Sequence, residues 1–406
     1  MTDFVSTWNE ESFLTTPVGP LGLIAMRGTE ELAGKVNQWL LKWRKHTEAT
    51  TVPGDMTTAP GMGREDFLVR TTCPRFGNGE GKGLIKDSVR GLDLYILCDV
   101  GAYNCTYDMY GQKVPMSPDD HFADLKRVIA AIEGKASRIS VIMPMLYEGR
   151  QHKRSSRESL DCAMALQELV QMGVSNIITF DAHDPRVQNA IPLSGFDNIR
   201  PSYQMLKALV HEYPDISLGK DDIAFISPDE GAMSRSMYFS SLLGVDLGMF
   251  YKRRNYTVII DGKNPIEAHE YLGKSVEGKD VVVVDDMIAS GESCLDVFEQ
   301  LKERGARRVF MFATFGLFTN GPDVFNKAYE KGLFDKVFTT NLIYTRPDVV
   351  ECPWYSSVNM CKYVAYIIDT LNHDQSISTL LNPVGRIHKL LDKQAEKNAQ
   401  QLKIGE

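Results

Sequence analysis

The sequence predicts an α/β protein with two domains, each built on a mostly parallel sheet flanked by helices. Length is the first observation, because 406 residues are more than one typical domain holds. The second is a rhythm in which short aliphatic or β-branched runs end in polar or glycine-containing turns and give way to amphipathic segments. Such alternation is typical of parallel sheets that helices cover on both faces.

Nine apolar runs predict strands, and the amphipathic segments between them predict helices. The expected strands are residues 21–26, 92–98, 138–144, 176–181, 222–227, 246–251, 280–286, 308–315 and 336–341. The expected helices include residues 121–134, 161–173, 234–244 and 294–305. A Thr-, Gly- and Pro-rich stretch near 46–66 has no core pattern and is expected to be an exposed loop insertion. We expect an N-terminal domain over 1–195, a C-terminal domain over 196–381 and a charged tail over 382–406.

Composition narrows the class of protein. Hydrophobic residues make up 43% of the chain and charged residues 24%, which is ordinary for a globular protein. A net charge of −8 argues against a general binder of nucleic acid or membrane surfaces, and no apolar stretch approaches the length of a membrane span. The seven cysteines form no CxxC pair, and the N-terminus has no basic region followed by an apolar one. Reduced thiols and a cytoplasmic location are therefore expected.

The stretch VVVVDDMIASGES, residues 281–293, runs from a buried strand into two adjacent acids and then into a small polar loop that opens a helix. Free amides at a helix N-terminus, a glycine that permits close approach and two hydroxyls form a cradle for a phosphate. The carboxylates of Asp285 and Asp286 are suited instead to ribose hydroxyls and Mg²⁺. The alternative is an ordinary helix with Ser290 as its N-cap.

Other strand ends carry further chemistry, at the place where an open α/β sheet holds its ligands. His183, Asp229, Lys252 and Arg254 each follow or end a predicted strand. Lysine and arginine are the residue types that neutralise charge on a transferring phosphoryl group. The alternatives are a hydrogen-bonded structural histidine, a turn acid and a solvated basic edge.

Several segments, in order along the chain, resemble the ribose-phosphate pyrophosphokinases, a family with the phosphoribosyltransferase fold. The loop over 285–293 is similar to that fold's pattern of two acids followed by Ser/Thr-Gly-x-Ser/Thr. The other matching segments are GTEELA (28–33), FGNGEGKGLIKDSVRGLDLYIL (76–97), MPMLYEGRQHKRSSRESL (143–160), IITFDAHDPRVQNAI (177–191), ISPDEGAMSRS (226–236) and KRRNY (252–256). The resemblance runs from about residue 21 to 381 and implies two phosphoribosyltransferase-like domains.

The resemblance also implies a reaction. A ribose-phosphate diphosphokinase moves the β,γ-diphosphoryl group of ATP as a unit to the anomeric hydroxyl of ribose 5-phosphate. The products are AMP and 5-phosphoribosyl 1-diphosphate, a precursor for nucleotide biosynthesis. Mg²⁺ is implied as the cofactor, and a homo-oligomer is implied, commonly built from dimers into hexamers, with ATP sites shared across subunits.

Residue roles follow from the matched positions. Lys252 and Arg254 are implied as catalytic, and His183 and Asp229 as metal-linked. The implied ATP contacts are Phe76, Asn78, Glu80, Arg150, Gln151 and His183. Of these, Phe76, Asn78 and Glu80 resemble the residues that reach ATP from a neighbouring subunit. The implied ribose 5-phosphate contacts are Asp285, Asp286, Ser290, Gly291, Glu292 and Ser293.

Some positions depart from the family pattern. Asn78 and His152 each stand where an acid is usual, and Asp184 stands where a small residue is usual. Ala289 replaces a third acid that many synthetases carry, Glu292 replaces a small residue, and no proline follows the basic triplet. These departures keep open a non-catalytic regulatory relative that assembles with active subunits. A transferase that consumes the diphosphate is a weaker alternative, since it needs only one such domain plus a hood. A nicotinamide-binding protein is weaker still, because no G-x-G-x-x-G follows a strand.

Overall fold

The computed structural model describes residues 17–50, 65–254 and 266–392, and the chain divides into two units. Unit 1 consists of Met1–Arg200, Asn341–Tyr344 and Asn359–Asn382. Unit 2 consists of Pro201–Thr340, Thr345–Val358 and Pro383–Glu406. Each unit holds one large sheet, with the order of its strands set by crossover connections.

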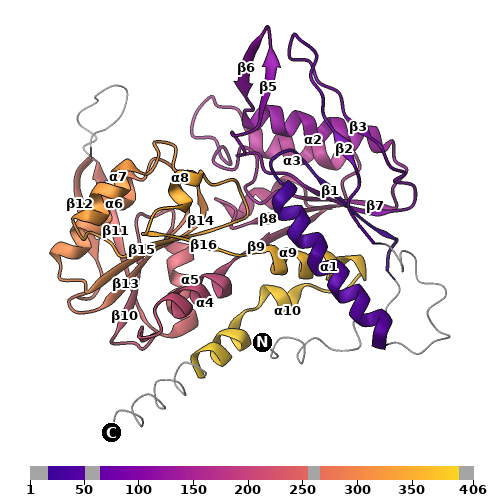
Figure 1. Ribbon diagram of the computed structural model, residues 1–406. Helices are drawn as coiled ribbons and strands as arrows, with labels where there is room; N and C mark the ends of the chain where they lie inside the picture. The colour runs from indigo at the N-terminus through magenta and orange to yellow at the C-terminus, as the bar shows by residue number, and fades with distance from the viewer. Residues whose placement is uncertain (1–16, 51–64, 255–265, 393–406) are drawn as a thin grey trace. The chain divides into compact units, whose positions relative to one another are not determined.

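Unit 1 is built on a five-stranded, fully parallel sheet in the order β1-β4-β7-β8-β9. Its strands are β1 (Leu21–Ala25), β4 (Asp93–Leu97), β7 (Arg138–Ile142), β8 (Asn176–Phe180) and β9 (Gly195–Ile199). Helices α2 (Pro118–Ile132) and α3 (Asp161–Gln171) lie on one face of the sheet, and α1 (Glu30–Thr50) and α9 (Cys361–Asn372) on the other (Figure 1). Because both faces are covered, every residue of β4 is buried.

Smaller elements of unit 1 lie outside this sheet. They are the strand pair β2 (Thr71–Thr72) and β3 (Leu84–Ile85), the strand pair β5 (Thr106–Met109) and β6 (Gln112–Pro115), the 3₁₀ helix η3 (Pro185–Ala190) and the short helix α10 (Ser378–Leu381).

A segment from near the end of the chain closes unit 1. The Asn372 side-chain amide, at the end of α9, donates to Asp93 Oδ2 at 2.9 Å and to the Gly19 carbonyl at 3.1 Å. Arg138 pairs with the same buried aspartate at 2.8 Å. The domain limits expected from the sequence, 1–195 and 196–381, stay a prediction. They place α9 in the C-terminal domain, whereas α9 packs in unit 1 of the structure.

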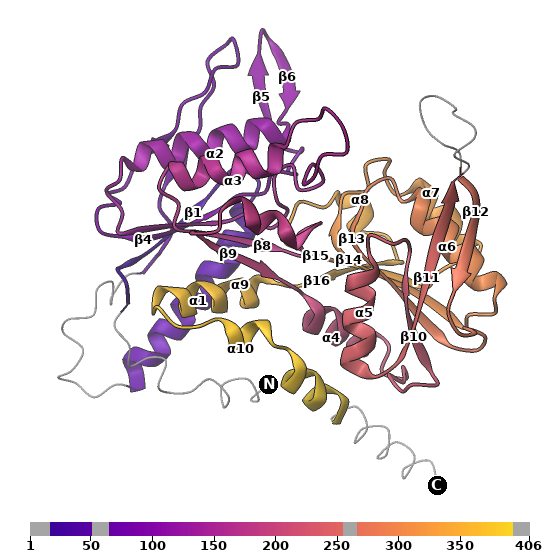
Figure 2. The same ribbon diagram turned by 180° about the vertical axis from the view of Figure 1, so that it is seen from behind.

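Unit 2 is built on a seven-stranded sheet in the order β12-β11-β10-β13-β14-β15-β16, parallel except for β12. Its strands are β10 (Ile223–Ser227), β11 (Asp246–Arg254), β12 (Ile266–Leu272), β13 (Asp280–Ile288), β14 (Arg308–Gly316), β15 (Lys336–Thr340) and β16 (Tyr355–Val358). Helices α4 (Ser202–Glu212) and α5 (Met233–Leu243) lie on one face, and α6 (Glu292–Glu303) and α7 (Asp323–Glu330) on the other (Figure 2). A short helix, α8 (Pro347–Val350), precedes β16. The α6 face has an aromatic core in which Phe325 stacks on Trp354 at a centroid distance of 5.1 Å.

The fold class expected from the sequence is confirmed, and all nine expected strands are present with small shifts at their ends. Within the two large sheets, the strands that the apolar runs did not predict are β9, β12 and β16, and all three lie at sheet edges. The two small strand pairs, β2 with β3 and β5 with β6, were not predicted either. Edge strands are partly solvated and therefore need no continuous apolar run.

The loop expected near 46–66 is partly wrong. Helix α1 continues to Thr50, so the first five of those residues are helical, and 51–64 lie outside the described residues. In the tail, 384–392 are helical and 393–406 lie outside the description.

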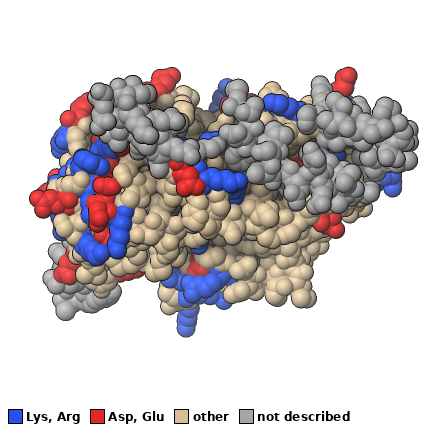
Figure 3. Space-filling view, turned by 90° about the horizontal axis from the view of Figure 1, so that it is seen from below, with Lys and Arg blue, Asp and Glu red and all other residues tan. Residues whose placement is uncertain are grey.

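On the face shown in Figure 3, basic and acidic side chains are interspersed rather than forming one extended basic surface. No helix within the described ranges is both long and apolar enough to cross a membrane. All seven cysteines are free thiols, six of them buried.

Candidate active site

In unit 2, the strands that carry the candidate residues are neighbours. The order β11-β10-β13 brings together the ends that lead to Lys252, Asp229 and Asp285. The three strands are parallel, and Ile226 of β10 lies level with Val283 of β13. Because parallel strands end at the same edge, the acids that follow β10 and those that end β13 share one side of the sheet.

The adjacent acids of β13 have different environments. Asp286 is buried, and its Oδ2 lies 3.8 Å from a terminal guanidinium nitrogen of the equally buried Arg235 on α5. Asp285 Oδ1 accepts a hydrogen bond of 2.8 Å from the Asp286 backbone N–H. Burial and the neighbouring Asp286 hold the pKa of Asp285 well above its usual range. Arg235 thus offsets one of the two charges, and the other carboxyl remains easily protonated.

Arg235 is a further candidate, which the sequence alone did not single out. It occupies the final arginine of the segment that matches S-P-D-x-G-x-x-x-R. Its position in that segment was the available signal, since an arginine inside a helix that covers a strand end is placed to reach an acid there.

The loop after β13 presents backbone donors. Gly291 caps α6 with φ 91°, and its carbonyl accepts from the N–H groups of Cys294 and Leu295 at 3.1 and 3.0 Å. Within the described ranges of the chain, no protein acceptor pairs with the N–H groups of Ser290, Gly291 or Glu292. Three successive unpaired amides at a helix N-terminus form an anion-binding nest. The alternative of Ser290 as the N-cap is wrong, because Gly291 caps the helix and no side chain does.

Only glycine fits position 291. A Cβ there would lie 2.3 Å from the Phe325 ring, and the backbone is in the left-handed region. Glu292 and Ser293 are exposed, so the acid at 292 extends into solvent while its amide remains at the nest. The first turn of α6 is thus compatible with an acid at this position.

Asp229 and the basic triplet complete the unit 2 candidates. Asp229 is half-buried, and its Oδ1 accepts from the Ala232 N–H at 3.1 Å, which leaves Oδ2 available. Lys252 and Arg254 lie in the last part of β11. The pairing of β11 with β12 has a bulge between Arg253 and Arg254. The side chains of Lys252 and Arg254, and residues 255–265 that follow them, lie outside the described residues.

In unit 1, two candidate loops follow neighbouring strands and are joined by a side-chain pair. The loop after β7 carries His152, and the loop after β8 carries Asp184. His152 Nδ1 lies 3.1 Å from Asp184 Oδ2, and the rings of His152 and His183 are 5.5 Å apart between centroids. Two of the departures from the family pattern are therefore partners.

The charge of that pair is set by its surroundings. The Arg186 guanidinium holds the pKa of Asp184 well below its usual range, because its Nε donates to Oδ1 and a terminal nitrogen donates to Oδ2 of that carboxylate. Burial lowers the pKa of His152, and the neighbouring Asp184 opposes that shift. A neutral His152 beside an ionised Asp184 follows at neutral pH, with Nδ1 as the donor.

Strained backbone presents His183 and Arg150. Asp181 has φ 42° and Glu148 has φ 51°, values that non-glycine residues seldom adopt. The Asp181 N–H still bonds to the Ile199 carbonyl of β9 at 2.9 Å, so the turn begins directly at the sheet. His183 and Arg150 are both exposed. Such strain persists where surrounding structure fixes it, and it is common at binding sites.

The remaining unit 1 candidates lie on ordered turns. The Gln151 amide donates to the Ser159 carbonyl at 2.9 Å and so ties the loop that follows β7. Asn78 donates to Glu80 Oε2 at 2.9 Å, and the Glu80 N–H donates back to Asn78 Oδ1 at 3.2 Å. An aspartate at position 78 could not donate to that glutamate. Phe76 is 54% exposed, which leaves its ring available to a ligand.

Comparisons with known proteins match most of the chain. A family model described as the N-terminal domain of ribose phosphate pyrophosphokinase matches residues 21–173. A second, described as a phosphoribosyl synthetase-associated domain, matches residues 258–382. The ribose-phosphate pyrophosphokinase of Vibrio parahaemolyticus is 28% identical over 313 residues, 76% of this chain and 90% of the relative. The ribose-phosphate pyrophosphokinase of Mycoplasma pneumoniae is also 28% identical over 313 residues, which are 76% of this chain and 87% of that relative.

A solved structure extends the likeness to the fold. The crystal structure of phosphoribosylpyrophosphate synthetase from Mycobacterium smegmatis superposes with a TM-score of 0.67 and 22% sequence identity. The match covers 87% of this chain and 99% of that one. Both units of the present chain thus have the arrangement of strands and helices found in that protein.

Proposed function

Because the chain belongs to the ribose-phosphate pyrophosphokinase family, we propose that it transfers the diphosphoryl group of ATP to ribose 5-phosphate. In this reaction the anomeric hydroxyl attacks the β-phosphorus, the bond from that phosphorus to the α-phosphate oxygen breaks, and AMP leaves. The hydroxyl proton is released as the new ester bond forms. Family membership favours this enzyme over the non-catalytic regulatory alternative.

The observation that carries the proposal is the nest of unpaired amides beside the acid pair. The N–H groups of Ser290, Gly291 and Glu292 suit the 5-phosphate, since they point three donors at one anion. Asp285 and Asp286 lie near the end of β13, just before this loop, and suit the ribose hydroxyls. The N–H groups that would bind the phosphate therefore adjoin the carboxylates that would accept hydrogen bonds from the ribose hydroxyls.

ATP would lie on the unit 1 residues. Arg150 and His183 suit phosphate oxygens, and the exposed Phe76 ring of a neighbouring subunit suits the nucleobase. Lys252 and Arg254 would neutralise charge on the transferring group, a role proposed from the sequence. Phosphoryl transfer needs positioning and positive charge more than covalent chemistry from the protein.

Mg²⁺ fits the donor set. Within the described part of the chain, no group of three His, Cys, Asp or Glu side chains could enclose a metal. Mg²⁺ instead prefers one or two carboxylates together with waters and substrate phosphates, and Asp229 offers one oxygen without a protein donor. Asp229 would contribute this oxygen to the ion, and the metal-linked role of His183 stays a prediction from the resemblance. When bound, the ion would supply positive charge to the ATP phosphates.

The decisive experiment mixes the purified protein with Mg²⁺, ATP and ribose 5-phosphate and follows phosphorus NMR. AMP and 5-phosphoribosyl 1-diphosphate should appear in equal amounts. A folded protein that binds both substrates and leaves them unchanged would favour the regulatory alternative. Production of ADP and orthophosphate alone would indicate hydrolysis and contradict the proposal.

The setting of the enzyme is part of the proposal. We infer a cytoplasmic homo-oligomer built from dimers, on the basis of the free thiols and the family resemblance. Light scattering on the purified protein would give its mass, and a monomer at all concentrations would contradict shared ATP sites.

A further inference from the structure

Residues 101–117 contain a hairpin that projects from unit 1. Within the described residues, strands β5 and β6 pair only with each other (Figure 1). The turn between them is at Tyr110 and Gly111, whose φ values are 49° and 76°. A lone two-stranded hairpin is at best marginally stable in water. Contacts with another part of the protein must therefore hold it, and the described contacts lead to the segment from Cys73 to Glu80.

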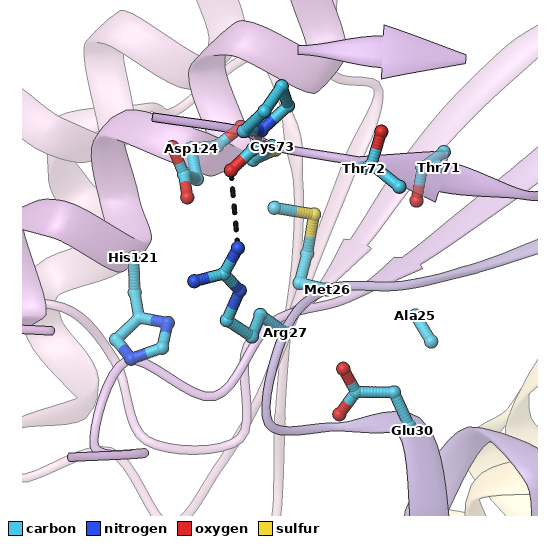
Figure 4. Close-up of a pocket in the computed structure, with 10 residues that line it drawn as sticks. Ala25, Met26, Arg27, Glu30, Thr71, Thr72, Cys73, His121 and Asp124 are labelled. Carbon is cyan, nitrogen blue, oxygen red and sulfur yellow. Dashed lines mark hydrogen bonds between the residues drawn. The ribbon is translucent and has the colours of Figure 1, made fainter. Parts of the chain in front are cut away.

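The base of the hairpin is tied to that segment by Arg27. Its guanidinium donates to the Thr106 carbonyl at 3.2 Å, contacts Met116 Sδ at 3.7 Å and donates to the Cys73 carbonyl at 3.3 Å. Figure 4 shows the last of these bonds across a cavity of about 300 Å³. One side chain thus joins the first strand of the hairpin, the residue after its second strand and the residue after β2, three positions before Phe76.

The middle of the hairpin is joined by an aromatic contact. The Arg75 guanidinium lies over the Tyr107 ring, 5.0 Å from its centroid, and is also paired with the buried Asp124 of α2. The Tyr107 hydroxyl donates to Asp120 at 3.3 Å. Arg75 is therefore held between α2 and the hairpin, one residue before Phe76.

The tip of the hairpin contacts the turn itself. Gly79 has φ 93°, and a Cβ there would lie 2.7 Å from Met109 Sδ and 3.7 Å from the Tyr107 ring. The Tyr110 N–H donates to the Gly77 carbonyl at 2.8 Å. The turn over 76–80 closes on itself through the bond from the Phe76 N–H to the Glu80 carbonyl, 2.7 Å. Its other side therefore rests on the hairpin.

We propose that the β5–β6 hairpin is a positioning element that holds the Phe76–Glu80 turn in the geometry in which it contacts ATP. This inference rests on the proposed function, in which Phe76, Asn78 and Glu80 are ATP contacts. An exposed phenylalanine on a glycine-containing turn would otherwise sample many orientations. Ordering the turn before binding removes that entropy from the association with ATP.

The test compares hairpin variants that face the turn with one that does not. Met109→Ala and Tyr107→Leu remove the contacts with Gly79 and Arg75, whereas Tyr107→Phe keeps the ring. Lys113→Ala, at an exposed position of β6, is the control. KM for ATP, KM for ribose 5-phosphate and kcat are measured for each folded variant, with hydrogen exchange of amides 76–82.

Met109→Ala and Tyr107→Leu should raise KM for ATP on the order of 5- to 20-fold and quicken exchange in 76–82. KM for ribose 5-phosphate should stay within about twofold, as should all constants of Tyr107→Phe and Lys113→Ala. Faster exchange with an unchanged KM for ATP would overturn the inference, and so would unchanged exchange.

Failure of the proposed function has a separate signature. A wild-type protein that forms no AMP would contradict the enzyme, while calorimetric ATP affinity of the same variants would still decide the role of the hairpin. Equal ATP affinity in wild type, Met109→Ala and Tyr107→Leu would contradict that role.

Discussion

The candidate residues of unit 2 and those of unit 1 are held in place by different kinds of interaction. In unit 2 the candidate site consists of backbone amides, a glycine that no other residue can replace and one buried ion pair. In unit 1 it consists of side chains that hold one another, such as His152 with Asp184 and Asn78 with Glu80. Backbone geometry allows few substitutes, whereas a side-chain pair can change both members and keep its contact. The family pattern is accordingly kept at Ser290 and Gly291, where the backbone forms the nest. It is altered in side chains, at positions 289 and 292 of unit 2 and at positions 78, 152 and 184 of unit 1.

The largest expected effect is at Gly291. Gly291→Ala should reduce the free energy of unfolding by about 3–5 kcal/mol, because a Cβ would meet the Phe325 ring and the left-handed backbone adds strain. Urea denaturation measures the loss. Gly332→Ala is the matched control, since that glycine also has positive φ but open space around it, and about 1 kcal/mol is expected. Equal losses for the two variants would contradict the requirement at Gly291.

The next effect concerns the buried ion pair. Arg235→Met should cost about 2–4 kcal/mol of stability, because it removes the positive charge that lies beside the buried Asp286 carboxylate. Asp286→Asn in the Arg235→Met background should recover part of the loss, as members of one pair are not additive. A double-mutant cycle by denaturation gives the coupling. Strict additivity would show that the two side chains act independently.

The unit 1 pair should respond more mildly. Asp184→Ala should raise KM for ATP about 3- to 10-fold, because His152 loses its partner and the two loops are no longer joined. The double variant His152→Asp with Asp184→Ala restores the usual family residue types and should lie closer to wild type than either single variant. Arg186→Ala, which removes an exposed partner of Asp184, should change KM less than about twofold. A KM for ATP that is higher in the double variant than in both single variants would contradict the idea that His152 and Asp184 together replace the usual family pair.

The smallest effect is a gain. Asp285→Asn should raise Tm by about 2–4 °C at pH 7 in the absence of substrate and metal, while weakening ribose 5-phosphate binding. The folded-state pKa of Asp285 is raised, so the wild-type carboxyl is unfavourable once the pH exceeds its unfolded value near 3.9. The advantage of the variant should therefore disappear near pH 4. Calorimetry at the two pH values checks this, and an equal gain at both would exclude ionisation as the cause.

The sequence predicted every interior strand of the two large sheets but not the edge strands β9, β12 and β16. Buried strands such as β4 and β13 must be continuously apolar, and that pattern can be read directly. The edge strand β9, with sequence GFDNI, carries no such pattern, because its position in the sheet relieves it of burial on both faces. The hairpin over 106–115 was missed because its stability depends on Arg27 and the turn at 76–80, which are distant in sequence.

The candidate site divides in the same way. Gly291 and its neighbours were predicted, since a backbone cradle leaves a fixed local spacing of small residues. The pairing of His152 with Asp184 could not be predicted, because each substitution alone looks like the loss of a family feature. Arg235 lay within a matched segment, but its partner Asp286 is on another strand. Local motifs predict which residues belong to the site, and only the fold shows which of them hold one another.

The return of the chain into unit 1 has a consequence for how the protein is made. Asp93 is fully buried and receives a hydrogen bond from Asn372, 279 residues later in the chain. During synthesis, strands β1, β4 and β7 leave the ribosome long before α9 exists to cover their second face. Contacts of such long sequence separation slow folding and expose apolar surface meanwhile. A fragment ending at residue 200 should therefore bind chaperones or aggregate, and the first unit should become protease-resistant only when nearly the whole chain has been translated.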